Sequence, residues 1–224
     1  MRISCLHTAA SNIAVFDAAA QALGIGPQVL RHEVRADLLA AAEQVGQLTA
    51  EIAASTTSAL LALARHAEVV VLTCSTLGPV VEGIATSTPI LRTDAALAAS
   101  AVQAGGKVVV LCAVETTLEP TSRLFRAAAL HSNATVEVQL VPGAWGLFKA
   151  GDIDGYLAAV AKAADAAYTA GASRVALAQA SMSGAAAYVS AGPRPLTSAL
   201  AGLEAAVRSV EHPLKVGLQK VDLG

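Results

Sequence analysis

The feature that most constrains the fold is a recurring alternation of short apolar runs with longer alanine-rich stretches of helical spacing. Apolar runs without alternating polar residues are typical of strands that are buried on both faces of a parallel sheet. Helices between successive strands then cover the two faces, so the pattern predicts the α/β class. The expected strands are residues 3–7, 29–34, 69–73, 89–91, 107–112, 135–141 and 174–178.

Helices are expected between most of these strands, and polar residues mark where several of them begin. Ser, Thr, Asn and Asp are favoured there because their side chains accept hydrogen bonds from the free amides of the first turn. Proline is tolerated in that turn because its missing N–H has no helical partner to lose. The predicted starts are Ser11 or Asn12 for a helix ending near Gly24, Thr116 or Thr117 for a helix with Pro120 in its first turn, and Asp154 for a helix ending near Gly171.

Two parts of the sequence match in pattern when the chain is shifted by 105 residues. The shift lays residues 3–12 over 108–117 and residues 69–78 over 174–183, in each case a strand followed by hydroxyl or amide residues. Such self-similarity predicts two pseudo-symmetric, Rossmann-like halves, each a parallel sheet with helices on both faces. The first half is expected to comprise residues 1–96 and 197–224, and the second residues 97–196. Because ligands bind beyond the carboxyl ends of parallel strands, four strand-to-helix turns should converge on one cleft between the halves.

The composition excludes several classes of protein. Only 14% of the residues are charged and the formal net charge is -2, whereas a nucleic-acid surface needs clustered Lys and Arg. Charges interrupt the apolar runs before about 18 residues, so no membrane span is predicted. The first residues lack the regions of a signal peptide, which predicts a cytoplasmic protein. No phosphate loop is present, and His32, His66, His131 and His212 have no metal-like spacing. We therefore expect neither cofactor nor metal.

Cys74 follows the apolar run 69–73, at a point where a helix is expected to begin. Free amides and the positive end of a helix dipole stabilise a thiolate, which makes a cysteine reactive near neutral pH. A cysteine at the end of an apolar strand is just as often an inert core residue, so spacing alone leaves both interpretations open. The other two cysteines, Cys5 and Cys112, lie within or at the end of strands and are interpreted as core residues.

The segment from Thr73 to Thr76, which contains Cys74, resembles the first catalytic-cysteine motif of the aspartate/glutamate/hydantoin racemase superfamily. Three further segments resemble that superfamily in the same order: residues 109–117 with a Thr-containing loop, residues 144–152, and residues 175–182 at the second cysteine motif. The resemblance covers the chain to about residue 210. It implies an enzyme independent of pyridoxal phosphate and other cofactors, in which one thiolate removes a proton beside a carboxylate and a second thiol returns one. It also favours a homo-oligomer.

The sequence departs from that pattern at the second cysteine, where Gln179 stands. The 105-residue shift independently pairs Gln179 with Cys74. The side-chain amide of glutamine can hydrogen-bond a carboxylate or an enediolate oxygen, but it cannot act as a general base. The departure therefore puts a two-base racemisation in doubt and leaves the reactions that need one thiol.

Candidate substrate-binding residues follow the same strand ends, where hydroxyls and free amides hold a carboxylate or simply cap a helix. His7 at the end of the first strand either tunes a thiol or is a satisfied structural residue. Trp145 and Phe148, which lie between glycines, either form a mobile flap over the site or pin a loop to the core. The predicted binding residues are Asn12, Ser75, Thr76, Thr116, Thr117, Ala180 and Ser181.

The hypothesis from these residues and the resemblance is a racemase/isomerase-type enzyme. Cys74 transfers a proton next to a carboxylate of a small substrate, and Gln179 stands opposite. Single-base epimerisation, isomerisation through a covalent cysteine adduct and decarboxylation followed by one-sided protonation all remain open. So does a different class of protein, a catalytically silent binder of small carboxylates.

Overall fold

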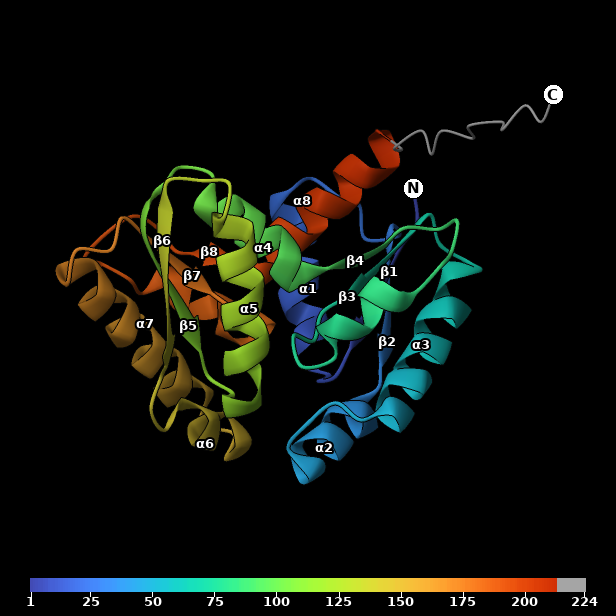
Figure 1. Ribbon diagram of the computed structural model, residues 1–224, viewed down its shortest axis with the longest axis horizontal. Helices are drawn as coiled ribbons and strands as arrows, with labels where there is room; N and C mark the ends of the chain where they lie inside the picture. The colour runs from blue at the N-terminus through green and yellow to red at the C-terminus, as the bar shows by residue number, and fades with distance from the viewer. Residues whose placement is uncertain (213–224) are drawn as a thin grey trace.

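The computed structural model describes residues 1–212, which form two four-stranded parallel sheets lying side by side (Figure 1). The strands of the first sheet are β1 (Ile3–His7), β2 (Leu30–Val34), β3 (Val69–Leu72) and β4 (Ile90–Arg92). Those of the second are β5 (Gly106–Cys112), β6 (Ala134–Leu140), β7 (Arg174–Leu177) and β8 (Leu196–Thr197). Eight α-helices are described: α1 (Asn12–Ala22), α2 (Ala36–Val45), α3 (Ala50–Ala64), α4 (Thr93–Val102), α5 (Leu118–Ala129), α6 (Ala144–Lys149), α7 (Ile153–Thr169) and α8 (Ser198–Glu211).

The two sheets have the same topology. Their strand orders are β2-β1-β3-β4 and β6-β5-β7-β8, and each adjacent pair is parallel. An offset of 105 residues carries both ends of β3 onto both ends of β7. The predicted α/β class with two similar Rossmann-like halves is therefore confirmed.

Helices cover both faces of each sheet, because strands such as β3 are buried along their whole length and leave no face for water. On the first sheet, α1 and α8 pack on one face and α2 and α3 on the other. On the second sheet, α7 packs on one face and α4 and α5 on the other. Since α8 returns to the first sheet, the chain crosses between the halves twice. The division at residues 96 and 197 stays a prediction. Residues 213–224 of that division lie outside the described part of the chain.

Several local predictions were wrong. β8 was missed because a strand of two residues has no periodicity to detect. Asp152, not Asp154, caps α7, and its side chain accepts a hydrogen bond from the amide of Gly155. Ser11 and Thr117 occupy N-cap positions without a side-chain capping bond. The hydroxyl of Thr117 is instead engaged with the carbonyl oxygen of Val114 and the side chain of Gln179.

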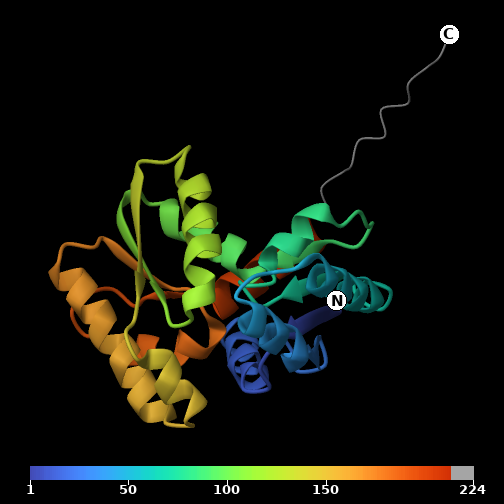
Figure 2. The same ribbon diagram turned by 60° about the horizontal axis from the view of Figure 1, so that its bottom comes forward.

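The carboxyl ends of the strands lie at the edge where α2 and α6 are seen at the bottom of Figure 1. Figure 2 shows the molecule turned so that this edge comes forward. In this view α1 and α2 of the first half lie on one side of the junction and α6 of the second half lies on the other. The turns that follow β1, β3, β5 and β7 are therefore gathered where the halves meet. Within residues 1–212, no helix is both long and apolar enough to cross a membrane.

Candidate active site

A buried cavity of about 50 Å³ lies between the two halves, at the carboxyl ends of the central strands. Cys74 after β3 and Gln179 after β7 both line it. The cavity thus contains both residues that the 105-residue offset pairs. Six of the seven predicted binding residues line it as well, namely Asn12, Ser75, Thr76, Thr117, Ala180 and Ser181. The seventh, Thr116, does not line the cavity, but its hydroxyl lies 3.5 Å from that of Thr76 across the junction.

Cys74 is 8% exposed, and a few hydrogen-bond donors surround its sulfur atom. Burial raises its pKa, and the negative charge of Asp94 adds to that effect. Hydrogen bonds from the hydroxyl of Thr8 and from the backbone amides of Leu77 and Thr76 act in the opposite direction but do not cancel it. The ground state of this residue near neutral pH is therefore a thiol, held where donors can stabilise the thiolate once a proton leaves.

The segment after Cys74 is not the α-helix that the sequence predicted. Residues 75–77 form a turn, and a short 3-10 helix, η1 (Gly78–Gly83), follows. Gly83 at the end of this segment disfavours a longer α-helix, whereas Pro79 stands in the first turn, where proline is tolerated. The dipole of so short a helix is small, so the direct amide contacts from Thr76 and Leu77, rather than a helix dipole, supply the stabilisation at the sulfur.

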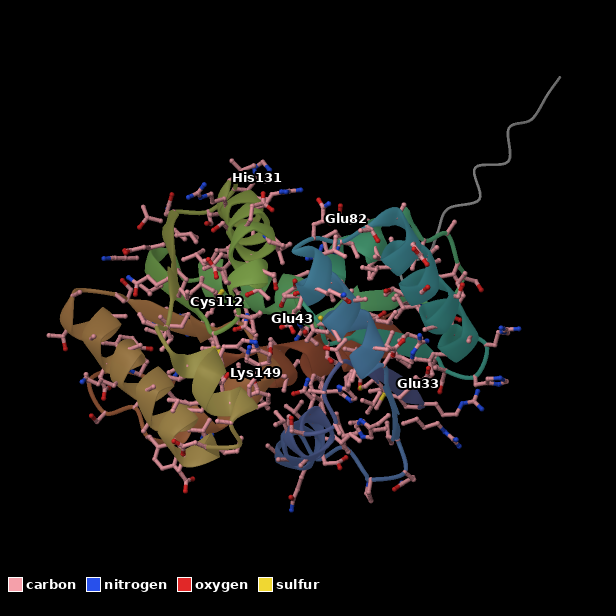
Figure 3. All side chains as sticks on the ribbon, turned by 90° about the horizontal axis from the view of Figure 1, so that it is seen from below. Glu33, Glu43, Glu82, Cys112, His131 and Lys149 are labelled. Carbon is pink, nitrogen blue, oxygen red and sulfur yellow. The ribbon has the colours of Figure 1, made fainter. Side chains whose placement is uncertain are left out.

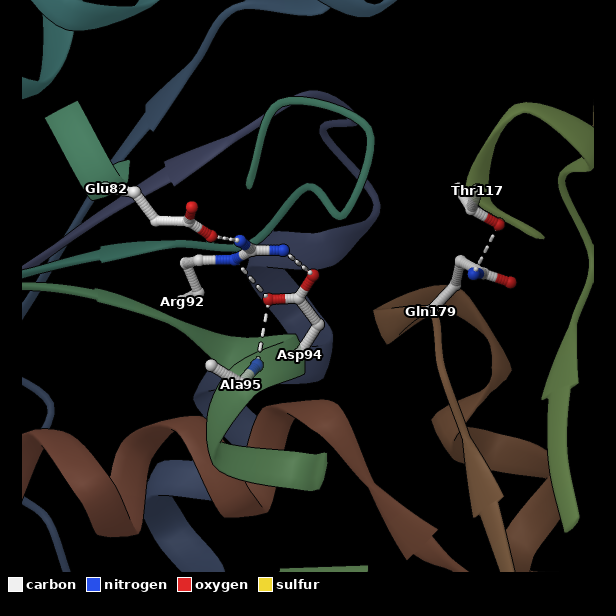
Figure 4. A network of polar contacts seen from close by, with 6 residues as sticks. All are labelled: Glu82, Arg92, Asp94, Ala95, Thr117 and Gln179. Atoms are coloured by element: carbon white, nitrogen blue, oxygen red, sulfur yellow. Dashed lines mark hydrogen bonds and ion pairs between the residues drawn. The ribbon is translucent and has the colours of Figure 1, made fainter. Parts of the chain in front are cut away.

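A buried ion-pair cluster lies behind this turn (Figure 4). The guanidinium of Arg92 donates two hydrogen bonds to the carboxylate of Asp94 and one to that of Glu82. Gly78 packs so closely on Arg92 that a Cβ atom at this position would lie 2.6 Å from a guanidinium nitrogen. The cluster holds the start of η1 in place, but Arg92 does not line the cavity.

The side-chain amide of Gln179 is already occupied by the protein. Its Oε1 atom accepts a 2.6 Å hydrogen bond from the backbone amide of Ala113, and its Nε2 atom donates to Thr117 Oγ1 at 3.1 Å (Figure 4). Gln179 also hydrogen-bonds the thiol of Cys112, whose pKa burial raises. The expectation that both ends of this amide are available to a substrate oxygen therefore needs correction. Gln179 fastens the turn after β7 to the turn after β5.

Cys112 is fully buried, and it does not line the cavity although it contacts two residues that do. Figure 3 shows it on the second half, beside the junction with the first. The side chains of Thr117, Thr121 and Gln179 lie beside its sulfur and lower its pKa, but the effect of burial is larger and raises it. Cys112 thus packs as the core residue that the sequence suggested.

One polar atom in the cavity wall has no partner. Asn12 is 7% exposed, and its Oδ1 atom makes no hydrogen bond within the described part of the chain. A buried acceptor without a donor costs about 1–3 kcal/mol, so it is free to bind a donor from a ligand. Among the described residues that line the cavity, none has an acidic, basic or imidazole side chain. The site is therefore built from hydroxyls, amides and one thiol.

Aromatic residues close the cavity on the side of the second half. The rings of Trp145 and Phe148 on α6 stack with centroids 4.9 Å apart, and Phe148 packs on the buried ring of Tyr156 at 5.2 Å. Phe148 thus joins the core, while both rings line the cavity. The glycines that flank α6, Gly143 and Gly151, have φ angles of 74° and 79°, a conformation that L-residues with side chains rarely adopt.

No protein-family model matches the sequence, and no curated protein matches it significantly. Solved structures match over 94% of the chain. Aspartate racemase from Picrophilus torridus superposes with a TM-score of 0.74 at 11% identity, covering 94% of that chain. Allantoin racemase from Pseudomonas fluorescens gives 0.65 at 15% identity and 91% coverage. Glutamate racemase from Thermus thermophilus, in complex with β-chloro-D-alanine, gives 0.62 at 15% identity and 80% coverage. This chain has the same fold as these aspartate, allantoin and glutamate racemases.

Within this racemase-type fold, the sequence missed some residues that line the cavity. Thr8 follows β1 and Thr73 follows β3, so the rule that placed Cys74 at a strand end could have found both. Leu39 reaches the cavity from α2, and no signal in the sequence marks it. His7 does not line the cavity, but its Nδ1 atom lies 3.0 Å from the hydroxyl of Thr73, which does.

Proposed function

We propose that the protein is a cofactor-independent enzyme of the racemase/isomerase type, in which Cys74 transfers a proton at the carbon next to a carboxylate of a small substrate. The observation that carries the proposal is that Cys74 and Gln179, one from each half, line the same cavity. The racemase fold supports the reaction class. The donors around the Cys74 sulfur support its role in proton transfer.

In the proposed reaction, the Cys74 thiolate takes the proton from the substrate carbon. The electron pair left on that carbon is delocalised into the carboxylate as an enediolate. The hydroxyls of Ser75 and Thr76 then stabilise the oxygens by hydrogen bonding. Reprotonation by the same thiol or by water completes the exchange, because Gln179 cannot act as a base.

A one-cysteine decarboxylase is the second candidate, and the raised pKa of Cys74 favours it. In that reaction the substrate loses CO₂ and leaves an enediolate. The Cys74 thiol then donates its proton to carbon, and water reprotonates the thiolate. A resting thiol is already in the form that this step requires, whereas a base must first lose its proton.

The uncharged cavity wall supports a small substrate that is held by hydrogen bonds and that offers a nitrogen-bound hydrogen to Asn12 Oδ1. An amino acid meets this description, as does an uncharged ring amide such as the compound named for the allantoin racemase neighbour. A volume of about 50 Å³ holds a few water molecules rather than such a substrate. Binding therefore requires the cavity to widen.

The test is exchange of carbon-bound hydrogen in deuterated water, with aspartate, glutamate, allantoin and phenylmalonate as probes. Proton NMR measures deuterium incorporation, and a coupled assay measures CO₂. Incorporation without CO₂ supports the isomerase-type reaction, and CO₂ release supports the decarboxylase. A probe that protects Cys74 from alkylation but shows neither outcome would overturn both in favour of a binding protein.

Two variants control for the thiol. Cys74→Ser is expected to lose at least about 100-fold in rate, because general acid–base groups contribute about 10²–10⁴-fold. Cys112→Ser removes a buried thiol that contacts the cavity wall but does not line it, and it is expected to retain activity. Equal losses in the two variants, with both proteins folded, would contradict the assignment of Cys74.

A further inference from the structure

A cluster of metal-ligating side chains lies on the face of the first sheet that α1 covers, behind the wall of the candidate active site. It consists of Cys5, His7 and His32, with one ligand atom from each, and all three atoms lie within 4.8 Å of one another. The strands impose this arrangement. Cys5 and His7 are two residues apart on β1, so their side chains point to the same face of the sheet. His32 lies on the adjacent strand β2, where it is the pairing partner of Cys5.

The two histidine rings already have the outer hydrogen-bond partners that metal-bound histidines have. His7 Nε2 and His32 Nδ1 face each other at 2.8 Å. The opposite nitrogen of each ring has an oxygen partner, Thr73 Oγ1 at 3.0 Å from His7 and Asp17 Oδ1 at 3.2 Å from His32. A metal-bound histidine almost always donates its second N–H to a carboxylate or another oxygen, which fixes the ring. Both second partners are present here.

The hydroxyl of Thr73 has two possible acceptors, and its choice of acceptor affects whether a proton or a metal ion lies between the two imidazoles. It also lies 3.1 Å from the carbonyl oxygen of Leu6. When the hydroxyl donates to His7, His7 Nε2–H bridges to His32 and no ion is needed. When it donates to Leu6, His7 Nδ1 carries the hydrogen instead. The lone pairs of His7 Nε2 and His32 Nδ1 then face one another, an arrangement that either a shared proton or a bound cation stabilises.

We infer that Cys5, His7 and His32 form a binding site for a zinc-type divalent cation, with Asp17 and Thr73 as the hydrogen-bond partners of its two imidazoles. Thiolate and imidazole are the ligands that Zn²⁺ prefers. Binding breaks the S–H bond of Cys5 and releases that proton to solvent, so the site gains a metal–sulfur bond. The fourth position is open to water.

Small movements bring the ligands to coordination distance. Two nitrogens on a tetrahedral zinc ion are separated by about 3.3 Å, given Zn–N bonds of about 2.0 Å. The two imidazole nitrogens must therefore move apart from 2.8 Å, and the rings, which now face each other at an interplanar angle of 20°, must tilt so that both lone pairs point at the ion. Access from solvent is available on the side of His32, whose side chain is 14% exposed, and of Asp17 at 58%.

The spacing of the histidines predicted no metal site, because the ligands come from two strands that only the sheet brings together. The site is also distinct from the proposed catalytic one. It touches the cavity through Thr73, which precedes Cys74 in the chain. An ion there would hold the β1–β2 pair and the Thr73 hydroxyl in a single arrangement.

The test is titration of the whole, chelator-treated protein with Zn²⁺ against a competing chromophoric chelator. One equivalent is expected to bind, and Co²⁺ in its place is expected to give a sulfur-to-cobalt charge-transfer band. Cys5→Ser should abolish that band, and His32→Asn should weaken zinc binding by at least about 100-fold. Asp17→Asn should weaken it by about 10–100-fold, as loss of a second hydrogen-bond partner does.

Cys112→Ser is the matched control, because it removes another buried thiol that belongs to no such cluster among the described residues. It should keep both the stoichiometry and the band, as should Cys74→Ala. Zinc binding that is unchanged in Cys5→Ser and His32→Asn, or no binding to the folded wild type, would overturn the site and leave the histidines as a hydrogen-bonded pair. Neither outcome affects the deuterium-incorporation test of Cys74, so either proposal can be overturned without the other.

Discussion

Replacing Gln179 with methionine should destabilise the protein, although the two side chains have similar size. The substitution removes the acceptor of the 2.6 Å bond from Ala113 and the donor to Thr117. Ala113 is 3% exposed, so its amide loses its partner where water has little access. An unpaired buried amide costs about 1–3 kcal/mol and the second hydrogen bond contributes about 1 kcal/mol. The expected loss in the free energy of unfolding is therefore about 2–4 kcal/mol.

Urea unfolding followed by circular dichroism measures this loss, and thermal unfolding should show a fall in Tm of about 4–16 °C, given about 2–4 °C per kcal/mol for a chain of this length. Gln139→Met is the matched control. Its amide makes a solvent-exposed hydrogen bond to Glu137, so the expected change is within about 0.5 kcal/mol. If the two variants lose the same stability, Gln179 does not fasten the two turns, and its amide is free for a ligand after all.

Two further predictions concern the ion-pair cluster and the thiol. Asp94→Ala should cost about 3–5 kcal/mol because it leaves the buried charge of Arg92 poorly compensated, whereas Glu82→Ala should cost less than about 1 kcal/mol, since Glu82 is 73% exposed. Urea unfolding compares the two, and equal losses would contradict the argument. Alkylation of Cys74 by iodoacetamide should increase with pH through a midpoint above about 8.5, the ordinary thiol value, because burial raises its pKa and only the thiolate reacts. Peptide mass spectrometry follows the reaction, and a plateau below pH 8 would show a thiolate in the resting protein.

The sequence by itself determined the α/β class, the two repeated halves and the position of most strands. Each of these follows from local patterns, because a strand buried on both faces must be apolar along its whole length. The same logic placed Cys74 and Gln179 at equivalent strand ends, and the structure puts both in one cavity. Strand ends are predictable sites because parallel strands present their carboxyl ends at one edge.

Only the tertiary structure decided what those residues do there. The helix expected after Cys74 is a turn and a 3-10 helix, so amides rather than a dipole contact the sulfur. Gln179 is engaged by Ala113 and Thr117, which are 66 and 62 residues away in the chain. Cys5 and His32 meet through strand pairing. Burial, hydrogen-bond partners and pKa depend on contacts between segments distant in sequence, and local periodicity carries no information about them.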